Sequence, residues 1–136
     1  MAWELGCFNI GNLLAASTMA SNQFKCVKAH TTNNQFTLCS VDGEVVLGVL
    51  QDKPASGESG DIMTIGVTKV TVGVGETLVA GQTWGTDSSG KAKTIEGTVT
   101  GADVGDYAAG MVLQGAAAGE LATVTIGFPT FKVEAQ

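Results

Sequence analysis

Arginine is absent from this sequence of 136 residues, so all seven basic side chains are lysines. Thirteen Asp and Glu residues outnumber them and give a formal net charge of −6. Proteins that bind DNA or RNA need a basic face, and they rely on the planar guanidinium group of arginine to hold phosphates and guanine edges. The charge balance therefore argues against nucleic acid as a partner of this chain.

Long hydrophobic runs are also missing. No stretch approaches the roughly 18 consecutive apolar residues that a membrane-spanning helix requires, so we expect no membrane partner. The stretch Met1–Ala20 is apolar but has no positive charge near its start, carries Glu4 and is interrupted by Asn9, Gly11 and Asn12. We therefore expect it to be retained and not removed as a secretory signal.

Histidine and cysteine are scarce. Cys7, Cys26 and Cys39 cannot all pair within one chain, and such an odd number is typical of synthesis in a reducing compartment. Cys26, His30 and Cys39 could be considered as metal ligands, but the close pairs of a zinc site, such as C-x-x-C, are missing. We expect small, buried, free thiols on strands, and no metal or other cofactor.

The titratable residues do not suggest catalysis. His30 is the only histidine, so acid–base chemistry would depend on carboxylates. These occupy turn positions such as Asp42, Glu58, Asp87 and Glu120, where solvated carboxylates are common. The sequence therefore favours a protein that is not an enzyme.

Glycine and β-branched residues are abundant, and they predict short strands joined by tight turns. Apolar and polar residues alternate over Phe24–Ala29 and Gln35–Ser40, and Asp42-Gly43 is typical of a hairpin turn. Val45–Leu50 is an apolar run that predicts a strand buried on both faces. Further strands are expected at Tyr107–Gln114 and Leu121–Phe128. The fold class is therefore all-β, either a small barrel or a two-sheet sandwich.

Two features refine this prediction. Ile62–Val74 is rich in β-branched residues, and its alternation places Val70, Val72 and Val74 on one face. In addition, Gly48–Val67 resembles Met111–Phe128: both contain Val-Leu-Gln, then a turn that includes Gly-Glu, then Thr-Ile-Gly. The likeness indicates two similar hairpins, one in each half of a barrel or sandwich, or else chance similarity between β-turn sequences.

Residues Gly85–Ala92, "GTDSSGKA", nearly match the phosphate-binding loop G-x-x-x-x-G-K-[ST]. Ala92 replaces the hydroxyl residue that would hold Mg²⁺, and the following residues are poor helix formers. Asp87 to Gly90 instead suits a type I turn. We expect the tip of a hairpin and no nucleotide site.

Several motifs, in order along the chain, resemble small capsid decoration (cement) proteins of tailed bacteriophages. Gly48–Glu58 matches a Gly-Val-Leu-Gln-x-Lys-Pro-x-x-Gly-Glu segment, and Gly66–Val70 matches the Gly-Val-Thr-Lys-Val strand that follows it. Ala80–Ala92 matches a hairpin ending in Asp-x-x-Gly-Lys-Ala, and Ala117–Val124 matches a closing strand. The resemblance covers roughly residues 20–128.

This resemblance implies a β-barrel or β-sandwich that binds the outer surface of a phage head. Its partner would be the major capsid protein, whose neighbouring subunits it would clamp as a homotrimer. The chain would then divide into an N-terminal arm (1–21), a β decoration domain (22–128) and a C-terminal tail (129–136).

The arm has no strand pattern and at most a short helix near Leu13–Met19. Its apolar side chains are candidates for contact with the capsid or a neighbouring protomer, because exposed apolar groups on a free arm would be a liability; they are Trp3, Phe8, Leu13 and Leu14. The alternative function is a virion-displayed module that binds a host surface or a glycan, with Trp84 stacking on the sugar.

Overall fold

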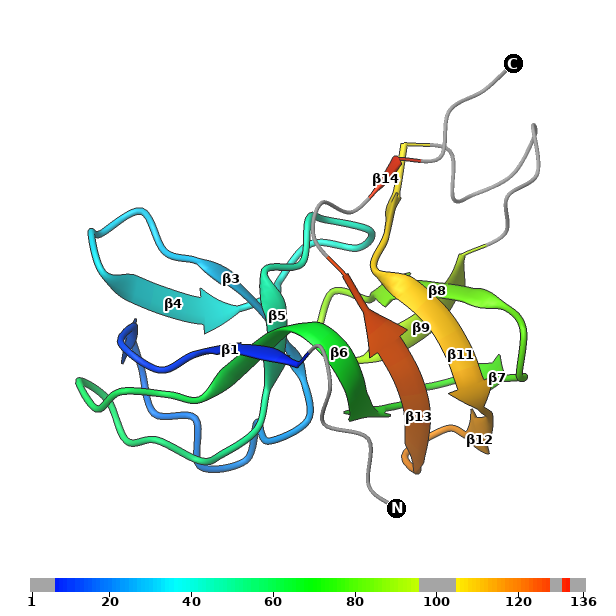
Figure 1. The fold of residues 1–136 in the computed structure, drawn as a ribbon, viewed down its shortest axis with the longest axis horizontal. Coiled ribbons are helices and arrows are strands. Elements are labelled where there is room, and N and C mark those ends of the chain that lie inside the picture. Colours follow the sequence, from blue (N-terminus) through cyan, green and yellow to red (C-terminus); the bar gives the residue numbers. More distant parts are fainter. Residues whose placement is uncertain (1–6, 96–104, 128–130, 133–136) are drawn as a thin grey trace.

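Strand β6 (Ile62–Thr71) connects the two halves of the fold in this computed structural model, which describes residues 7–95, 105–127 and 131–132. In Figure 1 it crosses from the group containing β1 to β5 to the group containing β7 to β13. The described residues form strands and turns only, so the all-β prediction is confirmed. None of them belongs to a helix that could cross a membrane.

The main sheet has ten strands, in the order β2-β4-β3-β5-β6-β13-β11-β8-β9, with β1 also paired to β6. Two small sheets pair β10 with β14 and β12 with β7. Among the described residues, β2 and β9 stand at the two ends of this order and do not pair with each other, so the arrangement is sandwich-like and not a closed barrel. The other strands are β1 (Phe8–Ile10), β2 (Leu14–Ala15), β3 (Cys26–Ala29), β4 (Gln35–Leu38), β5 (Gly48–Leu50), β7 (Thr77–Leu78), β8 (Thr83–Thr86), β9 (Ala92–Ile95), β10 (Tyr107–Ala108), β11 (Gly110–Gln114), β12 (Ala116–Ala117), β13 (Leu121–Ile126) and β14 (Phe131–Lys132).

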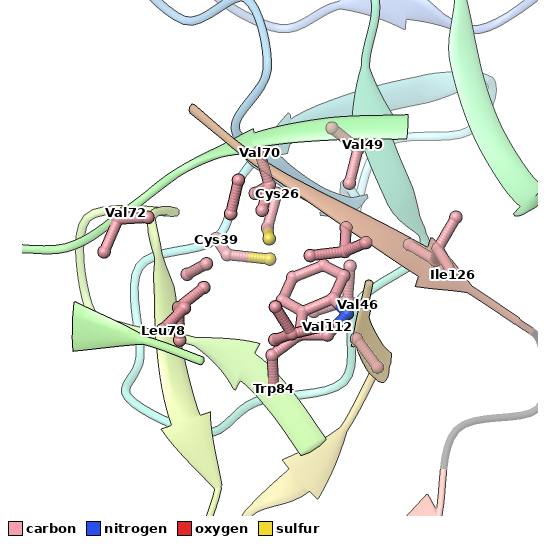
Figure 2. Packing of buried hydrophobic residues seen from close by; sticks show 14 residues of the cluster. Cys26, Cys39, Val46, Val49, Val70, Val72, Leu78, Trp84, Val112 and Ile126 are labelled. Carbon is pink, nitrogen blue, oxygen red and sulfur yellow. The ribbon is translucent and has the colours of Figure 1, made fainter. Parts of the chain in front are cut away.

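The larger hydrophobic core lies beneath β6, β8, β11 and β13, and Trp84 at its centre is fully buried (Figure 2). The inward-facing residues of β13 are Ala122, Val124 and Ile126, which alternate with exposed or half-buried neighbours as a strand requires. Val70 and Val72 also enter this core. Apolar burial of this kind is the main source of stability for the fold.

A second core lies between β2, β3, β4, β5 and the first residues of β6, and it includes the N-terminal segment. Ala15 and Met19 are each 1% exposed there and pack with Phe36 and Leu50. Backbone hydrogen bonds hold the segment in place, among them Met19 N–H to the Pro54 carbonyl at 2.9 Å. The sequence predicted no strand in the N-terminal segment and at most a short helix near Leu13–Met19. Both expectations are wrong, because the segment contains β1 and β2 and no helix among its described residues. Cys7 to Ser21 is therefore best treated as part of the β fold.

The predicted strands agree with β3, β4, β5, β6, β11 and β13, each somewhat shorter than its sequence pattern. The three residues of β5 are buried on both faces, as expected. The prediction of a hairpin at Asp42-Gly43 is wrong, because β4 and β5 do not pair with each other but lie on either side of β3. Val74 does not share the buried face of Val70, because β6 ends at Thr71 and leaves Val74 at a turn, 87% exposed.

The two similar segments form equivalent hairpins. In the first, β5 pairs with β6; in the second, β11 pairs with β13. Strands β6 and β13 then pair antiparallel over six residues, from Leu121 opposite Thr71 to Ile126 opposite Gly66. The prediction of two such hairpins is confirmed, and they meet along their second strands.

Candidate functional site

Of the residues expected to contact a partner, those that the structure describes do not form one free arm. Trp3 lies outside the described residues. Phe8 lies on β1 with 67% of its surface exposed, and Leu14 on β2 is 38% exposed. Leu13 is half-buried against the second core. Only Phe8 and Leu14 of the described candidates therefore present an exposed apolar surface.

Phe8 is held in position by the sheet. It lies opposite Ile65 of β6, and a shift of register between Phe8 and Asn9 bends the strand. The Thr64 hydroxyl donates a hydrogen bond to the Phe8 carbonyl at 2.9 Å, and the Asn9 amide donates to Asp61 at 2.9 Å. The aromatic ring is thus displayed from a strand that is fixed at both ends.

An apolar groove of about 230 Å³ lies beside Phe8, which forms part of its wall. Ile65, 42% exposed, extends the apolar surface along β6. Such a concave apolar surface on a strand pair is the kind of feature that marks a protein contact. The lining residues are Phe8, Ile10, Leu47, Thr64 and Ile65.

A second, larger groove of about 550 Å³ shares Leu47 with the first. Val45 and Tyr107 make it mostly apolar, and the ion pair between Lys28 and Glu44, with 2.7 Å between Nζ and Oε2, stands at one side. Burial raises the pKa of the Glu44 carboxyl, but the hydrogen bonds from Lys28 and from two backbone N–H groups outweigh it and leave the pKa lowered. Glu44 is therefore an ionised, fully engaged acceptor that stabilises its own loop.

The outer face of β6, β13 and β11 is a third apolar surface, one that sequence reasoning missed. Val67, Met111, Leu113 and Leu121 are each between 45% and 49% exposed there, and the only charged residue in these three strands is Lys69. The sequence offered little indication of this surface, because apolar residues occur on both faces of these strands. Only the burial pattern in the structure shows which apolar side chains face outward. This face lies on the opposite side of the sheet from the Trp84 core.

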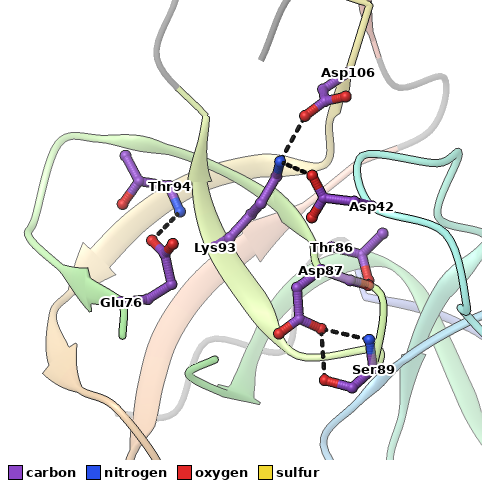
Figure 3. A network of polar contacts seen from close by, with 8 residues as sticks. All are labelled: Asp42, Glu76, Thr86, Asp87, Ser89, Lys93, Thr94 and Asp106. Atoms are coloured by element: carbon purple, nitrogen blue, oxygen red, sulfur yellow. Dashed lines mark hydrogen bonds and ion pairs between the residues drawn. The ribbon is translucent and has the colours of Figure 1, made fainter. Parts of the chain in front are cut away.

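Lys93 is the centre of a polar network that joins three segments (Figure 3). Its ammonium group lies 2.6 Å from a carboxylate oxygen of Asp42 and 2.6 Å from one of Asp106, and its side chain is only 9% exposed. Asp42 belongs to the segment between β4 and β5, Lys93 to β9, and Asp106 directly precedes β10. The network fixes these segments to one another. Asp42 lies at a turn with 56% of its side chain exposed, as the sequence predicts, but its carboxylate is also paired with Lys93.

The near-match to a phosphate loop is the tip of the β8–β9 hairpin, as predicted. One carboxylate oxygen of Asp87 accepts hydrogen bonds from Ser89 N–H and the Ser89 hydroxyl (Figure 3) and from Lys91 N–H, at 2.8 to 2.9 Å. The backbone donors that a phosphate would require are thus already bound to a side chain. A strand, β9, follows the turn where a nucleotide site would need a helix.

Trp84 cannot stack on a sugar in this fold. The side chain is fully buried, and its indole Nε1–H donates to the Thr125 carbonyl at 2.9 Å. The glycan-binding alternative therefore loses the residue that motivated it.

The cysteines agree only in part with their prediction. Cys26 and Cys39 are buried and free, whereas Cys7 is exposed, so the expectation of burial is wrong for Cys7. The imagined third ligand, His30, instead uses Nδ1 to accept a hydrogen bond from Thr32 N–H at 3.0 Å. Across the described parts of the chain, no three His, Cys, Asp or Glu residues are grouped as a metal would require.

Comparison with known proteins finds similarity among solved structures. No protein-family model matches the sequence, and no curated protein matches it. Among solved structures, the N base of the head fibre protein gp8.5 of bacteriophage phi29 is similar, with a TM-score of 0.64 and 14% sequence identity over 93% of this chain and 97% of that one. At this level of identity, the match shows a shared fold over most of both chains.

Proposed function

We propose that this chain is a non-enzymatic structural protein of a phage head. The observation that carries the proposal is the match of almost the whole chain to the base of a phage head fibre. A separate reason comes from the sequence, where motifs from Gly48 to Val124 resemble, in the same order, those of phage decoration proteins. A shared fold alone does not define a role, but here the fold and the motifs point to the same class.

The specific role we propose is decoration of the outer surface of the head. The chain would bind the major capsid protein, stabilise contacts between its subunits, and assemble as a homotrimer. Exposed apolar surface on a small protein needs a partner, and the Phe8 groove and the outer face of β6, β13 and β11 supply two separate apolar surfaces. Two surfaces suit a protein that contacts both a capsid subunit and another copy of itself.

Within this proposal, the Phe8 groove is the capsid contact. Phe8 is the most exposed aromatic side chain in the part of the chain that the structure describes. A fixed strand presents it, so little conformational entropy is lost on binding. Buried aromatic anchors often dominate protein interfaces. Leu14, exposed on β2, and Trp3 remain candidate contributors, whereas Leu13 contributes mainly to the second core.

The test uses heads of the virus that encodes this chain, assembled without it. Purified wild-type protein is added, and binding is measured by co-sedimentation and by the temperature at which the heads release DNA. We expect saturable binding and a higher release temperature. Phe8→Asp should weaken binding at least tenfold, since losing an anchor costs about 2 kcal/mol or more.

The matched control is Val74→Asp, which places the same charge at a turn that is 87% exposed. It should bind like the wild type. If the wild-type protein fails to bind the heads, the decoration role is refuted; if it binds and Phe8→Asp binds equally well, only the assignment of the Phe8 groove is refuted.

A further inference from the structure

Cys26 and Cys39 lie directly opposite each other across two neighbouring strands. The antiparallel ladder between β3 and β4 ends with Val27 opposite Leu38, and one residue further Cys39 N–H donates to the Cys26 carbonyl at 3.0 Å. Only this one bond joins the pair, because Cys26 N–H donates to the Gly90 carbonyl at 2.7 Å. Residues opposed at a hydrogen-bonded position of a regular ladder have Cα atoms about 5.5 Å apart, with their side chains on the same face of the sheet. That separation lies within the roughly 4.4–6.8 Å range of disulfide-bonded cysteines.

The side chains confirm this proximity. Both thiols enter the larger core, and Figure 2 shows their sulfur atoms close together beside Trp84. Both thiols are buried, so neither sulfur atom is turned toward solvent. Two thiols that enter one core from opposed positions of neighbouring strands need only small rotations of their side chains to meet.

We propose that Cys26 and Cys39 are a site of oxidative modification, at which a small peroxide converts the two thiols into a disulfide. The thiolate of one cysteine attacks hydrogen peroxide, so that an S–O bond forms, the O–O bond breaks and hydroxide leaves. The second thiolate attacks the resulting sulfenic acid; the S–S bond forms and a second hydroxide leaves. The two thiol protons convert the hydroxides into two water molecules, and the peroxide accepts two electrons.

The surroundings determine which oxidant can act. Burial raises the pKa of Cys26 well above its usual value and that of Cys39 to about 12, so both thiols are neutral and react slowly. A small, uncharged peroxide suits such a site better than a bulky disulfide reagent. In the reducing cytosol the thiols stay free, and the bond forms only after exposure to an oxidising medium. This inference does not depend on the proposed function.

The experiment is done on Cys7→Ser, because Cys7 is the exposed thiol and would otherwise link two chains. The folded variant is treated with hydrogen peroxide, quenched, and digested with trypsin under non-reducing conditions. Trypsin cleaves after Lys25 and Lys28, which separates Cys26 from Cys39 unless a disulfide joins their peptides. We expect a linked peptide pair, loss of both titratable thiols, reversal by dithiothreitol, and a melting temperature higher by on the order of 5 °C.

The control is Cys7→Ser with Cys39→Ala, in which no linked pair and no rise in melting temperature should form. Unchanged thiols in the folded Cys7→Ser variant, when the same protein unfolded in urea does oxidise, would refute the proposal. Separate sulfinic acids at Cys26 and Cys39 without a linkage would also refute it, because the sulfur atoms would then be too far apart to react with each other.

Discussion

Replacing Met19 by alanine tests whether the N-terminal segment belongs to the folded domain. Met19 is 1% exposed and packs in the second core with Phe36, Leu50 and Ile62. If the segment were a free arm, the substitution would have almost no effect on the free energy of unfolding. Because Met19 fills a core, the structure predicts a large loss.

The magnitude follows from the burial. Truncating a buried Leu, Ile or Met to alanine typically costs about 2–5 kcal/mol, since the transfer energy is lost and a cavity remains. This core is small and lies near the edge of the sheet, so its walls can partly collapse, and we expect about 2–4 kcal/mol. Against a total stability on the order of 5–15 kcal/mol, the loss is easy to measure.

The assay is urea unfolding followed by tryptophan fluorescence, with the slope of the transition compared between variants. Met19→Leu should cost less than about 1.5 kcal/mol because it nearly conserves volume. Val74→Ala, at an exposed turn, should stay within about 0.5 kcal/mol of the wild type. If Met19→Ala also stays within about 0.5 kcal/mol of the wild type, the packing of the N-terminal segment is refuted. Deletion of Met1–Ala20 removes both Ala15 and Met19 from the second core, so we expect it to abolish cooperative unfolding.

Three further predictions follow from local geometry. Gly110→Ala should destabilise by about 1–3 kcal/mol in thermal melts, because a Cβ there would collide with the Thr125 backbone, whereas Gly11→Ala, with open space around it, should be neutral. The pKa of Glu44 is lower in the folded protein than its unfolded value of about 4.5. The carboxylate therefore stabilises the fold fully above that unfolded pKa, and this stabilisation is lost as the pH falls through the folded pKa. Glu44→Gln should flatten the pH dependence of the urea midpoint in this acidic range. Lys91→Ala should change stability by less than about 0.5 kcal/mol, and ATP should not shift the melting temperature of the wild type; a saturable shift would overturn the hairpin interpretation.

The strands with a clear period were predictable from the sequence because alternation directly reflects which side chains face the core. The N-terminal segment was not, since β1 and β2 are only three and two residues long and depend on strands far along the chain. Pairing of Phe8 with Ile65, or of Leu14 with Gln35, leaves no local pattern. Such strands form because the sheet already exists, which is a tertiary effect that propensity cannot anticipate.

The exposed apolar surfaces were also harder to predict than the core, because they too depend on strand pairing. In β6, Val67 and Val70 have similar residue types, yet Val67 is half exposed and Val70 fully buried, because a three-residue step reverses the direction of a strand side chain. Which direction points to the core is decided by the pairing with β13, where Val70 opposes Ala122 and Val67 opposes Thr125. A shift of this register by one residue would bury Val67 and expose Val70. The outer face is therefore a property of the register, and any variant that moves the β6–β13 pairing would change the proposed contact surface together with the core.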